Sequence, residues 1–323
     1  MGREVLVYRA AEIRAALDMP SLIDAVEGAF VAYSAGDAEL PDVIHLDVPE
    51  SRGEIHVKAG HLHGARHYAV KVASGFSATD PPSIDGLVLA FDATDGRPAA
   101  LLLDDGFITD ARTGAAGGVA ARHLAPERVE RVAVIGTGLQ ARYQLDALAA
   151  VRAFSSVAVW GRDPDHADRC VADLREQPSL PAGVVVARAG SVEDAVRGAD
   201  VVLTCTASRE PLVRAAWLED RAHVTAVGSD GAGKQELDPE ILRTADVVAC
   251  DSRAQCARLG ELQHAREEID RAVELGEIAG GSAIGRGPAT RLTVCDLTGI
   301  GVQDVAAAAL VLERSEASLR IER

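Results

Sequence analysis

The hydrophobic pattern of the chain changes near residue 40. Before that point, a short apolar run at 4–8 predicts a strand, and apolar residues at helical spacing after Ser21 predict a helix that the Ser21 hydroxyl is suited to cap. From residue 43 to 103, alternating or continuous apolar runs are separated by Gly, Pro, Asp and Ser turns. They predict strands of a separate mixed or antiparallel sheet at 44–48, 54–57, 67–73, 87–92 and 99–103.

From residue 131 onward, short apolar runs alternate with helical patterns, which is typical of a doubly wound α/β sheet. The predicted strands are 131–135, 156–160, 184–187, 200–205, 223–227, 246–250 and 292–295, and the predicted helices are 140–150, 164–176, 191–197, 239–243 and 254–274. A small-residue helix at 109–124 links the two regions, and an apolar helix at 303–315 fits either of them. The predicted fold class is α/β: a Rossmann doubly wound parallel sheet plus a smaller α+β domain.

A phosphate-binding pattern follows the first strand of the parallel sheet. Gly136, Gly138 and Ala141 form G-x-G-x-x-A between that strand and the next helix. Gly136 permits a tight turn, Gly138 lets the backbone approach a pyrophosphate, and Ala141 keeps the helix close to the strand. An ordinary βα turn is the alternative, but the strand before the motif and the helix after it are the context that it requires. We therefore predict a dinucleotide site.

The end of the second strand bears on which dinucleotide is bound. NAD sites usually place an acidic side chain there to bind the ribose hydroxyls. This chain has Gly161 and Arg162 first, and Asp163 comes one residue later. Because arginine can hold a 2′-phosphate, NADP is favoured over NAD, although Asp163 also fits the ribose role.

Charge and cysteine content limit the other partners. The net charge of −16 argues against nucleic acid or an anionic membrane as a partner, so an anionic ligand must be held by a local group of Lys and Arg. The five cysteines are scattered without C-x-x-C spacing, so we expect neither a metal site nor a disulfide framework, and we expect a cytoplasmic location. Nothing in the sequence points to a signal peptide or a membrane span.

Three charged residues are candidates for substrate binding or catalysis. Lys71 lies inside an apolar strand and Arg112 near the start of the small-residue helix, and together they suit a carboxylate. Each alone also fits a surface lysine or a helix-terminal pair. Asp230 follows a predicted strand on the side where ligands bind in parallel sheets. It suits a general acid or base acting on a substrate nitrogen, or else a turn or capping aspartate.

With these residues identified, the chain resembles the ornithine cyclodeaminase/mu-crystallin family over nearly its whole length. The resemblance rests on Lys71 in its strand and on TDARTGAAG at 109–117, VIGTGLQAR at 134–142, GSDGAGKQELDP at 228–239 and DLTGIGVQDVAAA at 296–308. It implies a substrate-binding and dimerisation domain (1–118 plus 302–323), an NAD(P)-binding Rossmann domain (119–301), and a homodimer formed through the N-terminal sheets.

The resemblance also implies roles for single residues. Lys71 and Arg112 match the positions that hold the substrate carboxylate, and Asp230 matches the catalytic acid/base at the reacting nitrogen. Lys71 is expected to be catalytic together with Asp230. Thr113 and Val294 match positions near the phosphates and the nicotinamide. The residues expected to bind the cofactor are Gly136, Gly138, Leu139, Gln140, Ala141, Gly161, Arg162, Thr113, Thr206 and Val294.

One region departs from the family pattern. In members that act on ornithine, an arginine for the carboxylate and a glutamate for the distal amine precede the lysine strand, whereas this chain offers His45, His56 and Lys58 as candidate substrate-binding residues. Loss of the glutamate weakens ornithine and lysine as substrates, and Lys58 is better suited to an extra carboxylate or a neutral side chain. Both histidines also fit a strand-surface or hydrogen-bonded role.

Together these features predict an NAD(P)-dependent oxidoreductase that acts on the C–N bond of a small 2-amino or 2-imino acid, of the ketimine reductase or amino acid dehydrogenase type. Two alternatives stay open. One is a cyclodeaminase of the ammonia-lyase type that uses tightly bound NAD without net redox change. The other is a non-catalytic, mu-crystallin-like ligand-binding protein.

Overall fold

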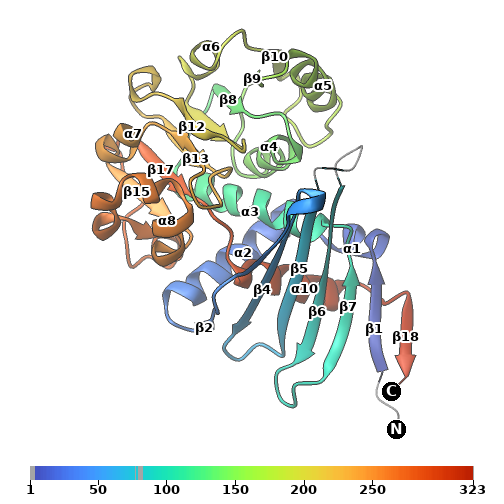
Figure 1. Cartoon of the computed structure of the whole chain (residues 1–323). Coiled ribbons are helices and arrows are strands. Elements are labelled where there is room, and N and C mark those ends of the chain that lie inside the picture. The colour runs from blue at the N-terminus through green and yellow to red at the C-terminus, as the bar shows by residue number, and fades with distance from the viewer. Residues whose placement is uncertain (1–3, 77, 79–82, 323) are drawn as a thin grey trace. The chain divides into compact units, whose positions relative to one another are not determined.

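The computed structural model describes residues 4–76, 78 and 83–322, and the chain divides into two compact units. The first unit comprises Met1–Arg112 and Ile300–Arg323, and the second comprises Thr113–Gly299. One boundary therefore falls inside helix α3 (Phe107–Leu124), and the other falls just before helix α10 (Gly301–Arg314) (Figure 1). Each unit is built on a sheet of its own.

The first unit contains a mixed sheet in the order β18-β1-β7-β6-β5-β4-β2, with β3 paired to β4. Strands β1 and β7 run parallel, and the other neighbours are antiparallel. The strands are β1 (Glu4–Arg9), β2 (Ala38–Glu39), β3 (Ile44–Val48), β4 (Gly53–Leu62), β5 (His67–Phe76), β6 (Ser83–Asp92), β7 (Pro98–Leu103) and β18 (Leu319–Glu322).

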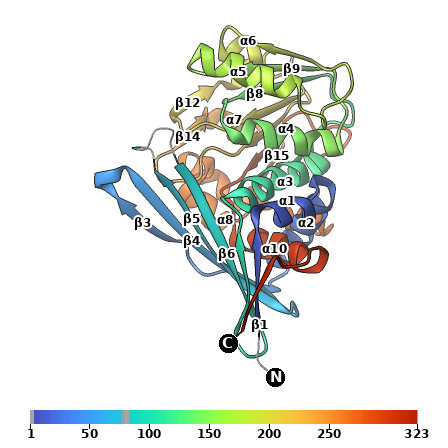
Figure 2. The ribbon, with the colours of Figure 1, turned by 90° about the vertical axis from the view of Figure 1, so that its right-hand side faces the viewer.

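The two faces of this sheet differ because side chains alternate along each strand. The register aligns Lys58, Lys71, Val88 and Leu102 on one face. Helices α1 (Ala10–Ala16), α2 (Met19–Ser34) and α10 cover this face (Figure 2). The other face carries an apolar row across five strands, formed by Ile44, Val57, Val72, Leu87 and Leu103.

The second unit contains a parallel sheet in the order β10-β9-β8-β11-β13-β17-β15-β16. Its strands are β8 (Arg131–Ile135), β9 (Ser156–Trp160), β10 (Val185–Arg188), β11 (Val201–Thr204), β13 (His223–Ala226), β15 (Val247–Cys250), β16 (Val273–Glu274) and β17 (Thr293–Asp296). A small second sheet pairs β12 (Arg209–Val213) with β14 (Gln235–Leu237). The helices are α4 (Leu139–Val151), α5 (Pro164–Arg175), α6 (Val192–Val196), α7 (Pro239–Thr244), α8 (Arg253–Leu259) and α9 (Leu275–Ala279).

Apolar side chains fill a core on each face of the parallel sheet. Val132 and Val134 of β8 point into the core shared with α4 and α5, whereas Ala133 and Ile135 point into the core shared with α6, α7 and α8. All four residues are fully buried. Solid apolar runs are the expected pattern for strands covered on both faces, so the sequence prediction of a doubly wound sheet is confirmed.

The structure corrects two sequence predictions and decides one that was open. The single helix predicted at 254–274 is wrong, because α8 ends before Gly260 and two short 3₁₀ helices follow (Glu261–His264 and Arg266–Arg271). Gly260 follows α8 in an extended conformation, and a side chain there would overlap the Asp296 carboxylate. The cap of α2 is Asp18, which accepts a bond of 3.0 Å from the Ser21 amide, and not the Ser21 hydroxyl. The final helix belongs to the first unit.

Candidate functional site

A buried cluster of charged side chains joins three elements of the first unit. Lys71 of β5 donates to Asp304 of α10 over 3.0 Å, and Arg112 Nε of α3 lies 3.1 Å from the same oxygen, Asp304 Oδ1. Arg112 Nη1 donates to Gln303 Oε1 over 2.6 Å. All four side chains are almost completely buried. We call Lys58, Lys71, Arg112, Gln303 and Asp304 the cation cluster.

The local sequence explains how these residues meet. The pairing of β4 with β5 sets Lys58 directly opposite Lys71. Gly301 allows α10 to begin against β4, because a side chain there would overlap the Ala59 carbonyl oxygen. That close approach places Gln303 and Asp304, in the first turn of α10, over the lysine row.

Positive charge exceeds negative charge in this cluster. Burial, and then the charge of Arg112, lower the pKa of Lys71 to about 7, although Asp304 acts in the opposite direction. Burial acts to raise the pKa of Asp304, but the charges of Lys71 and Arg112 outweigh it and hold that pKa below its usual value. Nearby Asp104 is buried, and its burial raises its pKa. The Asp304 carboxylate therefore lies in the field of Lys71, Arg112 and Lys58, and a bound anion would stabilise these cations.

Three buried polar atoms of the cluster lack hydrogen bonds within the part of the chain that the structure describes. They are Arg112 Nε, which forms only an ion pair with Asp304, and Asp304 Oδ2 and Gln303 Nε2, an acceptor and a donor. Buried polar atoms are seldom left unpaired in folded proteins. A ligand with a carboxylate for the cations and the Gln303 amide, and an N–H for Asp304, would satisfy all three atoms. A 2-amino or 2-imino acid carries both groups.

The three other predicted substrate residues lie on the same sheet face. His45 of β3 stands opposite His56 of β4, with ring centroids 4.7 Å apart and nearly perpendicular rings. His45 Nε2 lies 3.0 Å from an Asp47 oxygen, and His56 Nε2 lies 3.8 Å from a Glu54 oxygen. The register continues this face through Lys58 to Lys71. The structure thus brings His45, His56, Lys58, Lys71 and Arg112 to one face of the first unit.

The predicted phosphate turn lies in the second unit, between β8 and α4. A side chain at Gly136, which has a φ of +129°, would come within 2.6 Å of the Cys205 carbonyl oxygen, so only glycine fits. A side chain at Gly138 would meet nothing within 4 Å, and α4 begins there without a side-chain cap. Ala141 is fully buried. The open approach at Gly138 and the uncapped helix start suit the pyrophosphate of a dinucleotide.

The residues after β9 place one oxygen of Asp163 at the start of α5 and leave Arg162 exposed. A side chain at Gly161 would come within 2.5 Å of Thr137 Cγ2, so this position is fixed as glycine by close packing. Asp163 caps α5 and accepts bonds from the amides of Asp165 (2.9 Å) and His166 (3.2 Å), which lower its pKa. Arg162 is exposed beside them.

Asp230 lies in the loop between β13 and β14 of the second unit. It forms a 2.6 Å ion pair with Lys234, and its side chain is 48% exposed. The Ser229 hydroxyl donates to the Lys234 carbonyl oxygen over 2.9 Å, which closes the loop on itself. Asp230 therefore sits in a braced loop with an accessible carboxylate, and it does not act as a helix cap.

The remaining predicted cofactor residues are spread over the second unit. The Thr113 carbonyl oxygen accepts a bond from Gln144 Nε2, and the same Nε2 lies 3.3 Å from Gln140 Oε1. Leu139 is half exposed at the start of α4, and Val294 is buried in β17. Thr206 follows β11, and both its amide and its hydroxyl donate to Glu236.

Sequence reasoning missed Gln303, Asp304 and Glu236. The available signal for Asp304 was an acidic residue in the otherwise apolar run VQDVAAAALVL, which is unfavourable unless the acid has a buried partner. Across the described ranges, no group of three His, Cys, Asp or Glu side chains is arranged to hold a metal ion. None of the described helices is long and apolar enough to cross a membrane.

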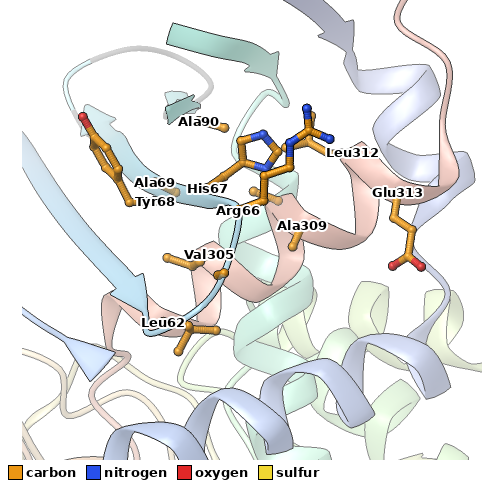
Figure 3. Close-up of a pocket in the computed structure, with 12 residues that line it drawn as sticks. Leu62, Arg66, His67, Tyr68, Ala69, Ala90, Val305, Ala309, Leu312 and Glu313 are labelled. Atoms are coloured by element: carbon orange, nitrogen blue, oxygen red, sulfur yellow. The ribbon is translucent and has the colours of Figure 1, made fainter. Parts of the chain in front are cut away.

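An apolar cavity of about 430 Å³ lies in the first unit, between α10 and the start of β5 (Figure 3). Leu62, Ala69, Val305 and Leu312 line it, and Arg66 and Glu313 stand at its edge. None of the predicted site residues lines it. It is a feature separate from the cation cluster.

Comparison with known proteins adds an independent line of information. A family model described as the ornithine cyclodeaminase/mu-crystallin family matches residues 3–318. A Sinorhizobium fredii protein described as an uncharacterized cyclodeaminase is 41% identical, over 92% of this chain and 92% of its own length.

Two solved structures share the fold. One, an archaeal alanine dehydrogenase dimer with bound NAD, has a TM-score of 0.87 and 32% identity, over 97% of this chain and 96% of its own. The other, the Thermococcus litoralis Δ(1)-pyrroline-2-carboxylate reductase in complex with NADH and L-proline, has a TM-score of 0.88 and 28% identity, over 96% and 97%.

The charge balance of the cation cluster predicts unequal effects of two buried substitutions. Asp304→Asn leaves Lys71 and Arg112 without their shared carboxylate and should lower the free energy of unfolding by about 3–5 kcal/mol. Lys71→Met removes one of the competing cations and should cost less than half as much. Urea unfolding followed by circular dichroism measures both. A larger loss in Lys71→Met than in Asp304→Asn would contradict the charge assignment.

Proposed function

The chain belongs to the ornithine cyclodeaminase/mu-crystallin family, and from this premise we propose that it is a reductase that converts a small 2-imino acid to the 2-amino acid and prefers NADPH. The broader prediction, an NAD(P)-dependent enzyme that acts on the C–N bond of amino or imino acids, is confirmed by the relatives. The cation cluster, with its surplus positive charge and its three polar atoms that lack hydrogen bonds, is the observation that supports the substrate class.

In this proposal the first unit binds the substrate. The Arg112 guanidinium and the Lys71 ammonium orient the substrate carboxylate, and the Gln303 amide donates a further bond to it. Asp304 keeps both cations in place and accepts from the substrate N–H through Oδ2. Holding the carboxylate and the nitrogen together fixes the imine carbon between them, and such positioning contributes much of the rate acceleration in two-substrate reactions.

The second unit binds the dinucleotide in this proposal. The backbone amides of Gly138, Leu139 and Gln140 would hold the pyrophosphate, and Thr113, Thr206 and Val294 would contact the phosphates or the nicotinamide. When bound, the nicotinamide supplies the hydride that the reaction consumes. The Asp230 carboxyl group exchanges a proton with the substrate nitrogen, and Lys234 holds that carboxyl in its loop.

The preference for NADPH rests on the end of β9. Arg162 can pair with a 2′-phosphate, whereas the Asp163 carboxylate is already bonded to two amides at the start of α5. An NAD site would need a carboxylate available for the ribose hydroxyls.

The side chain of the substrate would meet Lys58, His56 and His45. Lys58 lies opposite Lys71, where a second ammonium would be repelled. We therefore propose that imino acids with a neutral or acidic side chain are preferred over diamines. This argues against cyclodeamination of ornithine, although the S. fredii relative is described as an uncharacterized cyclodeaminase.

We also propose that two chains pair through the exposed face of the first sheet. Ile44 and Leu46 are 63% and 56% exposed, and they continue the apolar row through Val57, Val72 and Leu87. Exposed apolar patches of this kind mark interfaces, and the archaeal relative is described as a dimer. All five cysteines are free, and we propose a reducing cytoplasm as the location, which cell fractionation would test.

The direct test follows the loss of reduced-nicotinamide absorbance at 340 nm. Purified protein should consume NADPH with a cyclic 2-imino acid such as Δ(1)-pyrroline-2-carboxylate, or with a 2-oxo acid plus ammonia or methylamine. NADPH should be used faster than NADH, and Arg162→Ala should remove that difference. Ammonia release from ornithine without change at 340 nm would identify a cyclodeaminase instead, and nucleotide binding without any turnover would favour a binding protein.

Asp230→Asn is the matched variant for this assay. It should lower kcat by at least about 100-fold, because proton transfer by a positioned side chain contributes 10²–10⁴-fold. The affinity for NADPH, measured by its fluorescence, should stay within about threefold of the original. Turnover that survives the substitution would remove Asp230 from the mechanism.

The dimer proposal predicts a change of mass in solution. Leu46→Lys places a charge in the exposed apolar face and should shift the protein from dimer to monomer in light scattering after size-exclusion chromatography. Ile284→Lys is the control, because Ile284 is 85% exposed but belongs to the second unit. A monomeric original protein, or a Leu46→Lys variant that stays dimeric, would refute this interface.

A further inference from the structure

Glu236 is a fully buried carboxylate that collects four hydrogen bonds in the second unit. Its Oε1 accepts from the Thr206 amide (2.6 Å) and the Thr206 hydroxyl (2.8 Å). Its Oε2 accepts from the Thr204 hydroxyl (2.9 Å) and the Gly228 amide (2.8 Å). One side chain on β14 therefore joins the residues that follow β11 to the residues that follow β13. We call Thr204, Thr206, Gly228 and Glu236 the Glu236 knot.

The backbone in this knot is packed so closely that one position must be glycine. A side chain at Gly228 would overlap the Thr206 carbonyl oxygen and would come within 2.7 Å of Glu236 Oε2. The segments after β11 and β13 are thus in direct contact, and the carboxylate binds both of them. Gly228 is two residues before Asp230, so the knot fixes the base of the Asp230 loop.

Two further buried carboxylates hold Glu236 in place. Glu261 accepts from the amides of Glu236 (2.7 Å) and Leu237 (3.2 Å). Asp296 at the end of β17 accepts in turn from the Leu262 amide over 3.0 Å. Each carboxylate thus binds the backbone beside the next one. Burial raises the pKa of Glu236 to about 7, which shows how unfavourable this position is for a charge.

At the amino ends of the parallel strands, a more accessible carboxylate accepts the same kind of hydrogen bond from backbone amides. Asp200, which precedes β11, accepts from the amides of Glu130 (2.7 Å) and Arg131 (3.0 Å) while it stays partly exposed. A carboxylate can therefore hold neighbouring backbone segments together without being completely buried. Glu236 is instead completely buried, and it lies near the carboxyl ends of the parallel strands, where ligands bind in such sheets.

We propose that Glu236 is a positioning residue, which fixes Thr206 and the Asp230 loop relative to each other so that the nucleotide and the acid/base carboxyl are aligned. This inference rests on the proposed function for the roles of Thr206 and Asp230. Glu236 itself acts through these residues and through backbone amides. Its loss should lower turnover more than it lowers nucleotide affinity.

The test compares Glu236→Gln with Asp200→Asn. Each substitution weakens the hydrogen bonds that a carboxylate accepts from backbone amides, and the two carboxylates lie at opposite ends of β11. Amide hydrogen exchange by NMR should be at least about tenfold faster at Thr206 and Gly228 in Glu236→Gln. The reason is that losing a hydrogen bond to a charged group shifts the local opening equilibrium by at least about this factor. In Asp200→Asn, only Glu130 and Arg131 should exchange faster. The kcat should fall about 10–100-fold in Glu236→Gln, with the NADPH affinity within threefold, and should stay within twofold in Asp200→Asn.

The outcomes separate the two proposals. Faster exchange at Thr206 and Gly228 in a protein whose original form shows no turnover would show that Glu236 holds these two segments together, but would reject the proposed function and with it the catalytic purpose of that contact. Unchanged exchange, or equal losses of kcat in both variants, would reject the positioning role. If Glu236→Gln does not fold, Glu236→Asp keeps the charge but shortens the side chain by one methylene, and the same readouts apply.

Discussion

The ion cluster around Asp304 is the constraint on which the first unit depends. One carboxylate serves Lys71 and Arg112 in a site from which water is nearly excluded, and Lys58 stands in the same row. Burying charges is unfavourable unless they are paired, and among the described residues Asp304 is the ion-pair partner that Lys71 and Arg112 share. The free protein therefore carries excess buried positive charge, which a bound carboxylate would neutralise.

The backbone around the cluster is organised to make that arrangement possible. Lys71 and Asp304 are 233 residues apart in the sequence, and the entire second unit lies between them in the chain. The glycine at 301 brings α10 against β4, and the small residues of α10 keep it close to the sheet. The same design recurs in the second unit, where Gly228 and Gly260 allow backbone to meet the carboxylates of Glu236 and Asp296. In both units, glycine allows backbone to pack closely beside buried acids.

The sequence predicted the features that depend on local patterns. Each strand of the parallel sheet that was predicted forms within one residue of its expected bounds, because a short apolar run between helical segments is the pattern of a buried parallel strand. Lys71 and Gly136 were also recognised from local sequence. Lys71 is a charged residue within an apolar strand, and Gly136 is the first glycine of the G-x-G-x-x-A motif. Asp304 was missed because its partners are remote in sequence. The break at Gly260 was missed because the apolar periodicity continues past it, and the close approach of Asp296 to this glycine is a contact between remote residues.

The central claim is that the cation cluster binds a carboxylate, and proton uptake on binding tests it most directly. Lys71 has a pKa of about 7 in the free protein, so at pH 8 it is mostly neutral, and a bound anion should raise that pKa and draw a proton from solution. Titration calorimetry with pyrrole-2-carboxylate at pH 8, in buffers of different ionisation enthalpy, should give an uptake approaching about one proton per chain, and Lys71→Met should abolish it. Binding without proton uptake, or the same uptake in Lys71→Met, would contradict the account.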